Sequence, residues 1–305
     1  MLLRFLFYIL LSTTPICYGQ ASPNVYVLGI AQDGGYPHMG CLKLCCNKAW
    51  QNDSLKKFVT SLAIADPSTN KWWLIEATPD INAQLHFFQK ITNGKYNYLP
   101  DGILLTHAHI GHYAGLIQLG REVLNTNKIP VYAMPRMIHY LTNNGPWSQL
   151  VALQNIVLMP IVADSLMELT NNVSIAPFLV PHRDEFSETV GFKIITTNKK
   201  YLFLPDINKW NIWNRSIVSM VKEVDIALLD GTFGAADELP GRNMSEVPHP
   251  FITETMQLFN NENEEVRKKV HFIHFNHTNP AMWDKQIQRE IKSKGYQLAT
   301  QGGRL

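Results

Sequence analysis

Leu104 to His112 reads LLTHAHIGH, in which three histidines follow a short apolar run within six positions. Side chains of an extended segment alternate between its two sides, so His107 and His109 are expected to point the same way. His112 falls where the next helix is expected to begin. Imidazole is the commonest metal ligand among side chains, and three rings at this spacing can converge on one point. The stretch therefore predicts a metal site at the end of a strand.

Three later segments also end an apolar, strand-like run in a metal-ligand side chain. They read FLVPH at 178–182, YLFLPD at 201–206 and VHFIHFNH at 270–277. Taken alone, His182 could be a surface residue, and Asp206 could hold a turn or cap a helix. Four such strand ends in one chain favour a shared metal centre. His271, which lies inside the last strand, is expected to have no role.

The composition indicates a large buried core and little surface charge. Of the 305 residues, 46% are hydrophobic and 17% are charged, against ~25% charged in a usual soluble domain. The net charge is +2 with both signs balanced, which gives no footprint for a nucleic-acid partner that binds through charge. We expect a small-molecule substrate and no nucleic acid, and the sequence leaves the oligomeric state open.

Short β-rich runs alternate with helix-like stretches along the chain. The expected strands are 25–30, 72–75, 103–105, 131–133, 156–159, 174–179, 191–196, 201–204, 226–229 and 270–273, and the expected helices are 81–91, 112–124, 211–222, 251–259 and 281–294. Many strands are apolar on both faces, which is typical of a sheet covered on both sides. The pattern predicts an α/β or α+β fold with layered sheets and, since no linker-like stretch interrupts it, one domain over residues 20–305.

Residues 1–19 have the layout of a secretory signal peptide. Arg4 precedes an apolar run from Phe5 to Leu11, and Gly19 offers a small residue for cleavage. The run is shorter than the ~20 apolar residues that a membrane-spanning helix needs. We expect cleavage near Gly19, export to the periplasm or secretion, and no stable membrane insertion afterwards. An uncleaved anchor is the alternative, because the A-x-A pattern is absent.

Cys41, Cys45 and Cys46 lie within six residues of one another. An odd number of cysteines does not suit disulfides alone, and adjacent cysteines pair only under strain. Clustered thiolates suit a tetrahedral metal site that a histidine from elsewhere completes. One disulfide with a free thiol is the alternative.

The histidine and aspartate pattern resembles the metallo-β-lactamase superfamily, whose signature is H-x-H-x-[DG]-H followed by His, Asp and His at later strand ends. The resemblance covers essentially all of residues 20–305. It implies a four-layer αββα sandwich with the metals at one edge between the two sheets. It also implies two metals bridged by Asp206, the first held by His107, His109 and His182 and the second by His112 and His274.

One position departs from the superfamily pattern. Gly111 stands where the signature usually has an aspartate, which ligates the second metal and orients the attacking water. Three protein ligands remain for that metal, and three ligands with a water can hold a metal ion. Asp33 or Asp80, each just after an expected strand, could replace the missing carboxylate, although turn formation is the ordinary role of both.

Four segments resemble a narrower family, the pyrroloquinoline-quinone biosynthesis protein B family. They read GIAQDGGYPH at 29–38, THAHIGHYAG at 106–115, DGTF at 230–233 and TNP at 278–280. Gly111 fits this narrower pattern, although it departs from the wider one.

The cysteine cluster resembles that of a related family, the cyclic phosphodiesterase of phosphonate breakdown. In that family the cluster holds a structural zinc, which a histidine three residues after the last catalytic histidine completes. The resemblance therefore leaves His274 to the catalytic site, although the roles of His274 and His277 could be exchanged. The implied ligands of the structural zinc are Cys41, Cys45, Cys46 and His277.

These resemblances imply a metal-dependent hydrolase. A bound metal lowers the pKa of its water to about 7, which suits a phosphodiester, cyclic phosphate, lactone or thioester substrate. Asp206 would bridge the metals. His249 resembles the helper histidine of phosphodiesterase and tRNA-processing relatives and would protonate the leaving group, with helix entry as its ordinary role. The expected cofactors are one structural zinc and one or two catalytic zinc ions, with manganese or iron as alternatives at the catalytic site.

Two other functions stay open. The narrower family is implicated in a tyrosine hydroxylation step, which implies an iron-dependent oxygenase-type role. The signal peptide argues against this role, because cofactor assembly on a ribosomal peptide is expected in the cytoplasm. The third alternative is a non-catalytic metal-binding protein, since a fold does not by itself define an activity.

Overall fold

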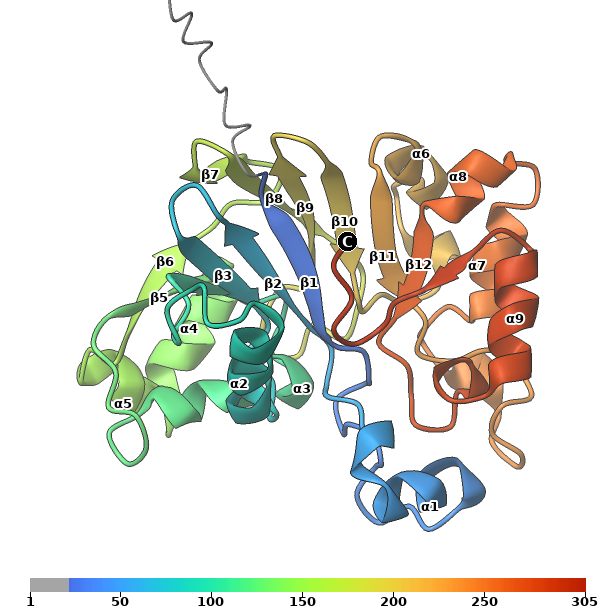
Figure 1. Ribbon diagram of the computed structural model, residues 1–305, viewed down its shortest axis with the longest axis horizontal. Helices are drawn as coiled ribbons and strands as arrows, with labels where there is room; N and C mark the ends of the chain where they lie inside the picture. Colours follow the sequence, from blue (N-terminus) through green and yellow to red (C-terminus); the bar gives the residue numbers. More distant parts are fainter. Residues whose placement is uncertain (1–21) are drawn as a thin grey trace, which may run out of the picture.

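The computed structural model describes residues 22–305, so the predicted signal peptide of residues 1–19 lies outside the described part of the chain. Two sheets stack face to face, and helices lie on their outer faces (Figure 1). This is the αββα arrangement, and it confirms the predicted fold class. Within residues 22–305, none of the helices combines the length and the apolar character that a membrane crossing requires.

The first sheet follows the chain in order from one edge to the other. Its strands are β1 (Asn24–Gly29), β2 (Ser61–Asp66), β3 (Lys71–Ile75), β4 (Gly102–Leu104), β5 (Ile129–Ala133) and β6 (Ile156–Pro160). Pairing is antiparallel from β1 to β3 and parallel from β3 to β6. On the outer side, a buried apolar cluster joins this sheet to α2 (Ile81–Ile91), α4 (Pro135–Asn143) and α5 (Trp147–Ala152).

The second sheet is also ordered along the chain. Its strands are β7 (Met167–Thr170), β8 (Val173–Leu179), β9 (Val190–Thr196), β10 (Lys200–Leu204), β11 (Ile226–Asp230), β12 (Val270–Ile273) and β13 (Gln297–Leu298). Pairing is antiparallel from β7 to β10 and parallel from β10 to β13. The helices of this half are α6 (Ile217–Lys222), α7 (Ile252–Leu258), α8 (Glu264–Lys268) and α9 (Lys285–Ser293).

The main core lies between the sheets and continues under the helices of the second half. It contains apolar side chains of both sheets, such as Ile64, Trp73, Phe192, Leu202 and Phe272, which are at most 3% exposed. Both faces of the inner strands are therefore covered, as their continuous apolar runs predicted. Removing this area from water is the main force that holds the two halves together.

The expected elements were right in type but incomplete. The predicted helix 112–124 is only a short turn, α3 (Ile110–Tyr113), followed by 3-10 turns to Leu119. The predicted helices 211–222 and 281–294 start late, at Ile217 and Lys285, where Ser216 and Asp284 provide side-chain N-caps. The missed elements are β2, β7, β13, α4, α5, α8 and α1 (Leu44–Gln51). Most of these are short segments, whose placement depends on tertiary packing, whereas β2 is a fully buried strand that was overlooked.

Candidate metal centre

The parallel strands bring the predicted ligands to one edge of the sandwich. In the first sheet, Ile75 at the end of β3 lies opposite Leu104 at the end of β4. In the second sheet, Leu204 of β10 lies opposite Leu229 of β11, and Asp230 lies opposite Ile273 of β12. The carboxyl ends of parallel strands open at the same edge, where ligands commonly bind.

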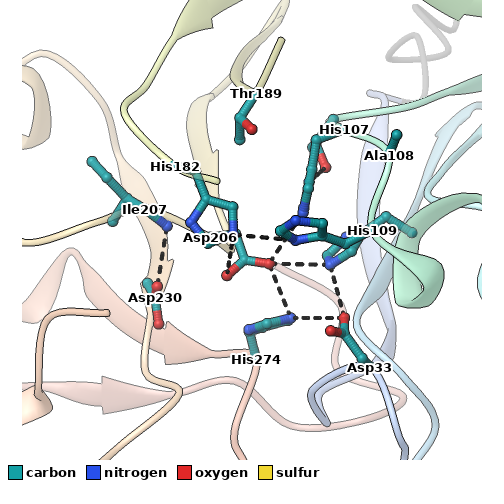
Figure 2. A network of polar contacts seen from close by, with 12 residues as sticks. Asp33, His107, Ala108, His109, His182, Thr189, Asp206, Ile207, Asp230 and His274 are labelled. Carbon is teal, nitrogen blue, oxygen red and sulfur yellow. Dashed lines mark hydrogen bonds and ion pairs between the residues drawn. The ribbon is translucent and has the colours of Figure 1, made fainter. Parts of the chain in front are cut away.

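Asp206, two residues beyond β10, lies at the middle of this edge (Figure 2). Its Oδ2 is 3.2 Å from His112 Nε2 and 3.5 Å from both His107 Nε2 and His274 Nε2. Its Oδ1 is 3.7 Å from His182 Nε2. The carboxylate therefore lies between histidines that follow a strand of the first sheet and histidines that follow strands of the second sheet, as a bridging ligand must.

Two groups of ligand atoms meet at Asp206. In each group the ligand atoms all lie within 4.8 Å of one another. The first group contains His107, His109, His182 and Asp206, and the second contains Asp33, His112, Asp206 and His274. All six predicted ligands of the centre are thus brought together in the predicted division.

The polar atoms that face the centre fit a metal. Asp33 Oδ1 and the Nε2 atoms of His107, His112 and His274 are buried, and within residues 22–305 none has a hydrogen-bond partner. Buried polar atoms are almost always satisfied, so this convergent set is suited to bind an ion. Imidazole nitrogen and carboxylate oxygen are ligands that zinc, manganese and iron accept.

Asp33 takes the place of the carboxylate that Gly111 lacks. Its Oδ1 lies 3.2 Å from His112 Nε2 and 3.8 Å from His274 Nε2. A Cβ atom added to Gly111 would lie 2.1 Å from this same oxygen and 2.6 Å from the Cα of Asp33. A side chain at position 111 would overlap the Asp33 side chain, so Asp33 can enter the site only because residue 111 is glycine. Asp80 is not part of it, because its Oδ2 accepts a hydrogen bond from Val59 N at 2.8 Å.

Each histidine of the centre has a second partner on its outer nitrogen. The pairs are Thr106 Oγ1 with His107 Nδ1 at 2.8 Å, Glu185 Oε2 with His109 Nε2 at 3.3 Å, Glu76 Oε1 with His112 Nδ1 at 3.5 Å, Asn208 Oδ1 with His182 Nδ1 at 3.2 Å, and Thr232 Oγ1 with His274 Nδ1 at 3.0 Å. Such contacts fix the ring orientation and the tautomer of a metal ligand. Four of the rings are therefore oriented by hydrogen bonds, whereas His112 Nδ1 and Glu76 Oε1 lie at ion-pair distance and, within residues 22–305, form no hydrogen bond.

The backbone of the centre and the protonation of His107 also suit metal binding. Glu76 and His274 have left-handed backbone angles, with φ values of 73° and 66°, an arrangement that costs energy and is often found at functional sites. Burial lowers the pKa of His107 well below its usual value, and neighbouring His112 lowers it further. His107 is therefore neutral, which is the form that binds a metal.

His249 lies beside the centre as part of a third group. Its Nδ1 is 2.9 Å from Asp230 Oδ2 and 3.2 Å from Asp206 Oδ1. Burial opposes protonation of His249, but the Asp230 carboxylate, with Asp206 behind it, raises its pKa to about 9. Asp230 is fixed in turn, because it accepts hydrogen bonds from the backbone N–H groups of Ile207 and Thr232.

The cysteine cluster forms a separate four-residue group. Sγ atoms of Cys41, Cys45 and Cys46 and a ring nitrogen of His277 lie within 4.8 Å of one another. The three cysteines are free thiols, so the alternative with a disulfide is not what the structure shows. Burial, and then neighbouring His38, lower the pKa of His277 to about 4, which keeps its ring neutral. Three sulfurs and one imidazole suit tetrahedral zinc.

Several site residues were not identified from the sequence. Glu76, Asn208 and Glu185 carry no recognisable spacing signal, because their role depends on which segment packs against them. Asp230 and Thr232 belong to the DGTF segment, which was singled out without a role. His271 lies outside every ligand group of the described residues.

The fold and the centre together define the class of protein. The chain matches the Beta-lactamase superfamily domain over residues 71–275 and therefore belongs to that family. Among curated proteins it is similar to coenzyme PQQ synthesis protein B of Methylorubrum extorquens strain PA1, with 25% identity over 304 residues that cover 92% of this chain and 98% of the relative. The same protein of Xanthomonas euvesicatoria is 26% identical, with 85% and 91% covered.

Solved structures show the same fold. Zn(2+)-bound PqqB from Methylobacterium extorquens has a TM-score of 0.75 at 22% identity and covers 92% of this chain and 99% of its own. A diphosphatase from the PhnP family has a TM-score of 0.65 at 19% identity, with 93% and 97% covered. Human tRNase Z, short form, has a TM-score of 0.56 at 15% identity, with 92% and 98% covered.

Proposed function

We propose that this protein is a metal-dependent hydrolase that acts on a small phosphodiester, cyclic phosphate or lactone. The observation that carries the proposal is the position of Asp206, which is shared by both groups of ligand atoms. Hydrolytic enzymes of two kinds, a diphosphatase and tRNase Z, share the fold. Metals held there would lower the pKa of a bound water and stabilise the developing charge of the substrate.

The chain's own residues supply positioning and a proton. Most of the histidines around Asp206 are held by the outer contacts described above, so the centre needs little rearrangement on binding. Asp230 holds His249 through Nδ1 at 2.9 Å, which leaves Nε2 of the same ring to donate a proton to a leaving oxygen. A pKa of about 9 keeps His249 protonated at neutral pH.

The experiment that tests this proposal is metal content per chain, with bis(p-nitrophenyl) phosphate and a lactone panel as substrates. We expect zinc or manganese in the centre and one zinc at the cysteines. His274→Ala should lose a metal of the centre, and His277→Ala should lose the cysteine-site zinc. His86→Ala, an exposed histidine of α2, is the matched control. Full metal retention in His274→Ala would contradict our division between His274 and His277.

A second candidate is iron-dependent oxygen chemistry. It is favoured by the similarity to coenzyme PQQ synthesis protein B along 92% of this chain. Two histidines and a carboxylate, here His112, His274 and Asp33, also suit non-haem iron. One iron per chain at the centre, with no turnover of any ester, would support this candidate over the hydrolase.

We further infer that the protein is exported, on the basis of the signal-peptide layout of residues 1–19. Amino-terminal sequencing of the protein from a bacterial periplasmic fraction tests this. A first residue near Gln20 supports export with cleavage, and a first residue of Met1 in the cytoplasmic fraction contradicts it.

A further inference from the structure

A small pocket, whose lining contains none of the candidate metal ligands, lies between α9 and the C-terminal segment. It has a volume of about 190 Å³. Its polar lining consists of Lys57, Lys285, Gln288, Lys292, Thr300 and Gln301. Lys285, Gln288 and Lys292 share one face of α9, because residues three and seven positions apart align along a helix. Lys57 reaches the pocket from the segment that precedes β2.

The pocket carries positive charge that no carboxylate balances. None of its lining residues is acidic, and within residues 22–305 none of the three ammonium groups lies within ion-pair distance of a carboxylate. Lys57 is half-buried; burial lowers its pKa, and the Lys285 ammonium lowers it further. Two like charges that face each other across a small space are costly unless an anion is shared between them.

Hydrogen bonds orient the two glutamines of the pocket. Gln301 Oε1 accepts a hydrogen bond from Phe58 N at 2.8 Å, so the NH₂ group of Gln301 remains available as a donor. Gln288 Oε1 accepts from Lys285 Nζ at 3.2 Å, and Gln288 Nε2 donates to Ala281 O at 3.0 Å. Lys285 is thereby oriented by its own helix. A donor-rich pocket with three cations matches a small oxyanion that has several acceptor oxygens.

We propose that this lysine pocket, made of Lys57, Lys285, Lys292 and Gln301, binds a phosphate-class oxyanion, either free phosphate or the phosphate group of a small monoester. The volume of about 190 Å³ admits a ligand of this size. The site is independent of the reaction at the metal centre. Its apolar floor nevertheless includes Ile30 and Phe275, whose backbones are hydrogen-bonded at 2.8 Å. Asp33 follows Ile30 closely in the sequence, and His274 directly precedes Phe275. An occupied pocket would therefore steady the segments that carry Asp33 and His274.

The test is amine-reactive labelling of the metal-loaded full chain, read by mass spectrometry at each lysine. Inorganic phosphate and glycerol 3-phosphate are compared with sodium chloride at the same ionic strength. We expect protection of Lys57 and Lys285, and none of Lys90, an exposed lysine of α2. Protection by phosphate alone identifies free phosphate as the ligand, and protection by both compounds includes monoesters. Protection by neither overturns the proposal.

Calorimetry with inorganic phosphate separates this pocket from the metal centre, which can also attract phosphate. Lys57→Gln/Lys285→Gln should weaken the pocket's phosphate binding at least about tenfold, because each charged hydrogen bond contributes that much or more. Lys90→Gln should match the wild type. Asp206→Asn should keep the lysine-dependent binding. Phosphate binding that survives in the lysine variant and disappears in Asp206→Asn would contradict the proposal.

Discussion

The two metal-ligand regions of this protein are built in opposite ways. The ligands of the centre come from both sheets and from both ends of the chain, and Asp206, His107 and His112 are at most 2% exposed. The cysteine site takes three of its four ligands from within six positions, on α1 and the loop before it, which project from the sandwich (Figure 1). The packing of the two sheets assembles the centre, whereas few packing contacts hold the cysteine site.

Packing explains this difference. In α1 only Cys46 and Ala49 are buried, while Met39, Leu42 and Leu44 around it are more than 80% exposed. A segment with so small a core cannot offset its conformational entropy by burial. We therefore expect metal at the cysteines to stabilise the loop, and the sandwich to stabilise the centre.

The largest effect is expected from Asp206→Asn. The change removes the carboxylate shared by both ligand groups, so kcat/KM should fall on the order of 10³-fold or more. Elemental analysis should show metal lost from the centre and zinc retained at the cysteines. Loss of both metals together, with an altered circular dichroism spectrum, would show that the two regions are not independent.

A smaller loss is expected from Asp33→Gly, on the order of 10²-fold in kcat/KM, because the second ligand group loses its carboxylate. The double variant Asp33→Gly/Gly111→Asp moves the carboxylate from position 33 to position 111. A Cβ at position 111 would lie 2.1 Å from Asp33 Oδ1, which the variant removes, and 2.6 Å from the Cα of residue 33, which it keeps, so the new side chain enters the vacated space only with a backbone shift. Steady-state kinetics and metal titration should show partial recovery. Failure of the double variant to exceed Asp33→Gly would contradict the exchange.

The role of His249 is tested by the pH dependence of the rate. Its raised pKa of about 9 means that the protonated donor is present below that pH and is lost above it. The wild-type kcat should therefore decline as pH rises through about 9, and His249→Asn should lower kcat by about 10²-fold and remove this decline. An unchanged alkaline limb in the variant would exclude His249 as the proton donor.

Cys46→Ser tests the cysteine loop directly. We expect loss of the structural zinc and rapid proteolysis within residues 38–57, with kcat changed by less than about tenfold, because local opening need not spread to the core. Limited proteolysis with mass spectrometry locates the cut. Ser54→Ala, on the same loop, is the matched control. Loss of metal from the centre in Cys46→Ser would refute the separation of the two regions.

Glu238 connects the loop that carries His249 to the TNP segment, and its effect concerns stability alone. It accepts hydrogen bonds from Thr278 Oγ1 and Gly234 N, while burial raises its pKa to about 7. The folded state then holds a proton that the unfolded state releases above about pH 4.5. Stability should therefore fall as pH rises from about 4.5 to about 7, by up to about 3 kcal/mol.

Glu238→Gln should flatten this dependence of the free energy of unfolding, measured by urea titration at several pH values. Glu122→Gln, an exposed glutamate, should leave it as in the wild type. A steep fall that persists between pH 4.5 and 7 in Glu238→Gln would assign it to other groups.

Much of the candidate centre could be predicted because its ligands follow apolar strands closely. His107, His182, Asp206 and His274 stand within three residues of a strand end, so local spacing was enough to select them. Helix boundaries were predicted less well. The stretch 112–124 was expected to continue as a helix, but it turns after Tyr113 and packs in 3-10 geometry against α2.

The amino-acid sequence was enough to predict most strands, the layered α/β class and the residues that can bind metal, because these depend on short-range periodicity and on side-chain chemistry. Only the tertiary structure decided which carboxylate completes the centre. Asp33 and Asp80 both follow strands and are chemically alike, but only Asp33 is packed against Gly111 and His112. The tertiary structure likewise decided that Glu76 and Asp230 lie beside the histidines that they contact. Contacts between segments that are far apart in the sequence depend on how the two sheets pack, and no local sequence pattern specifies that packing.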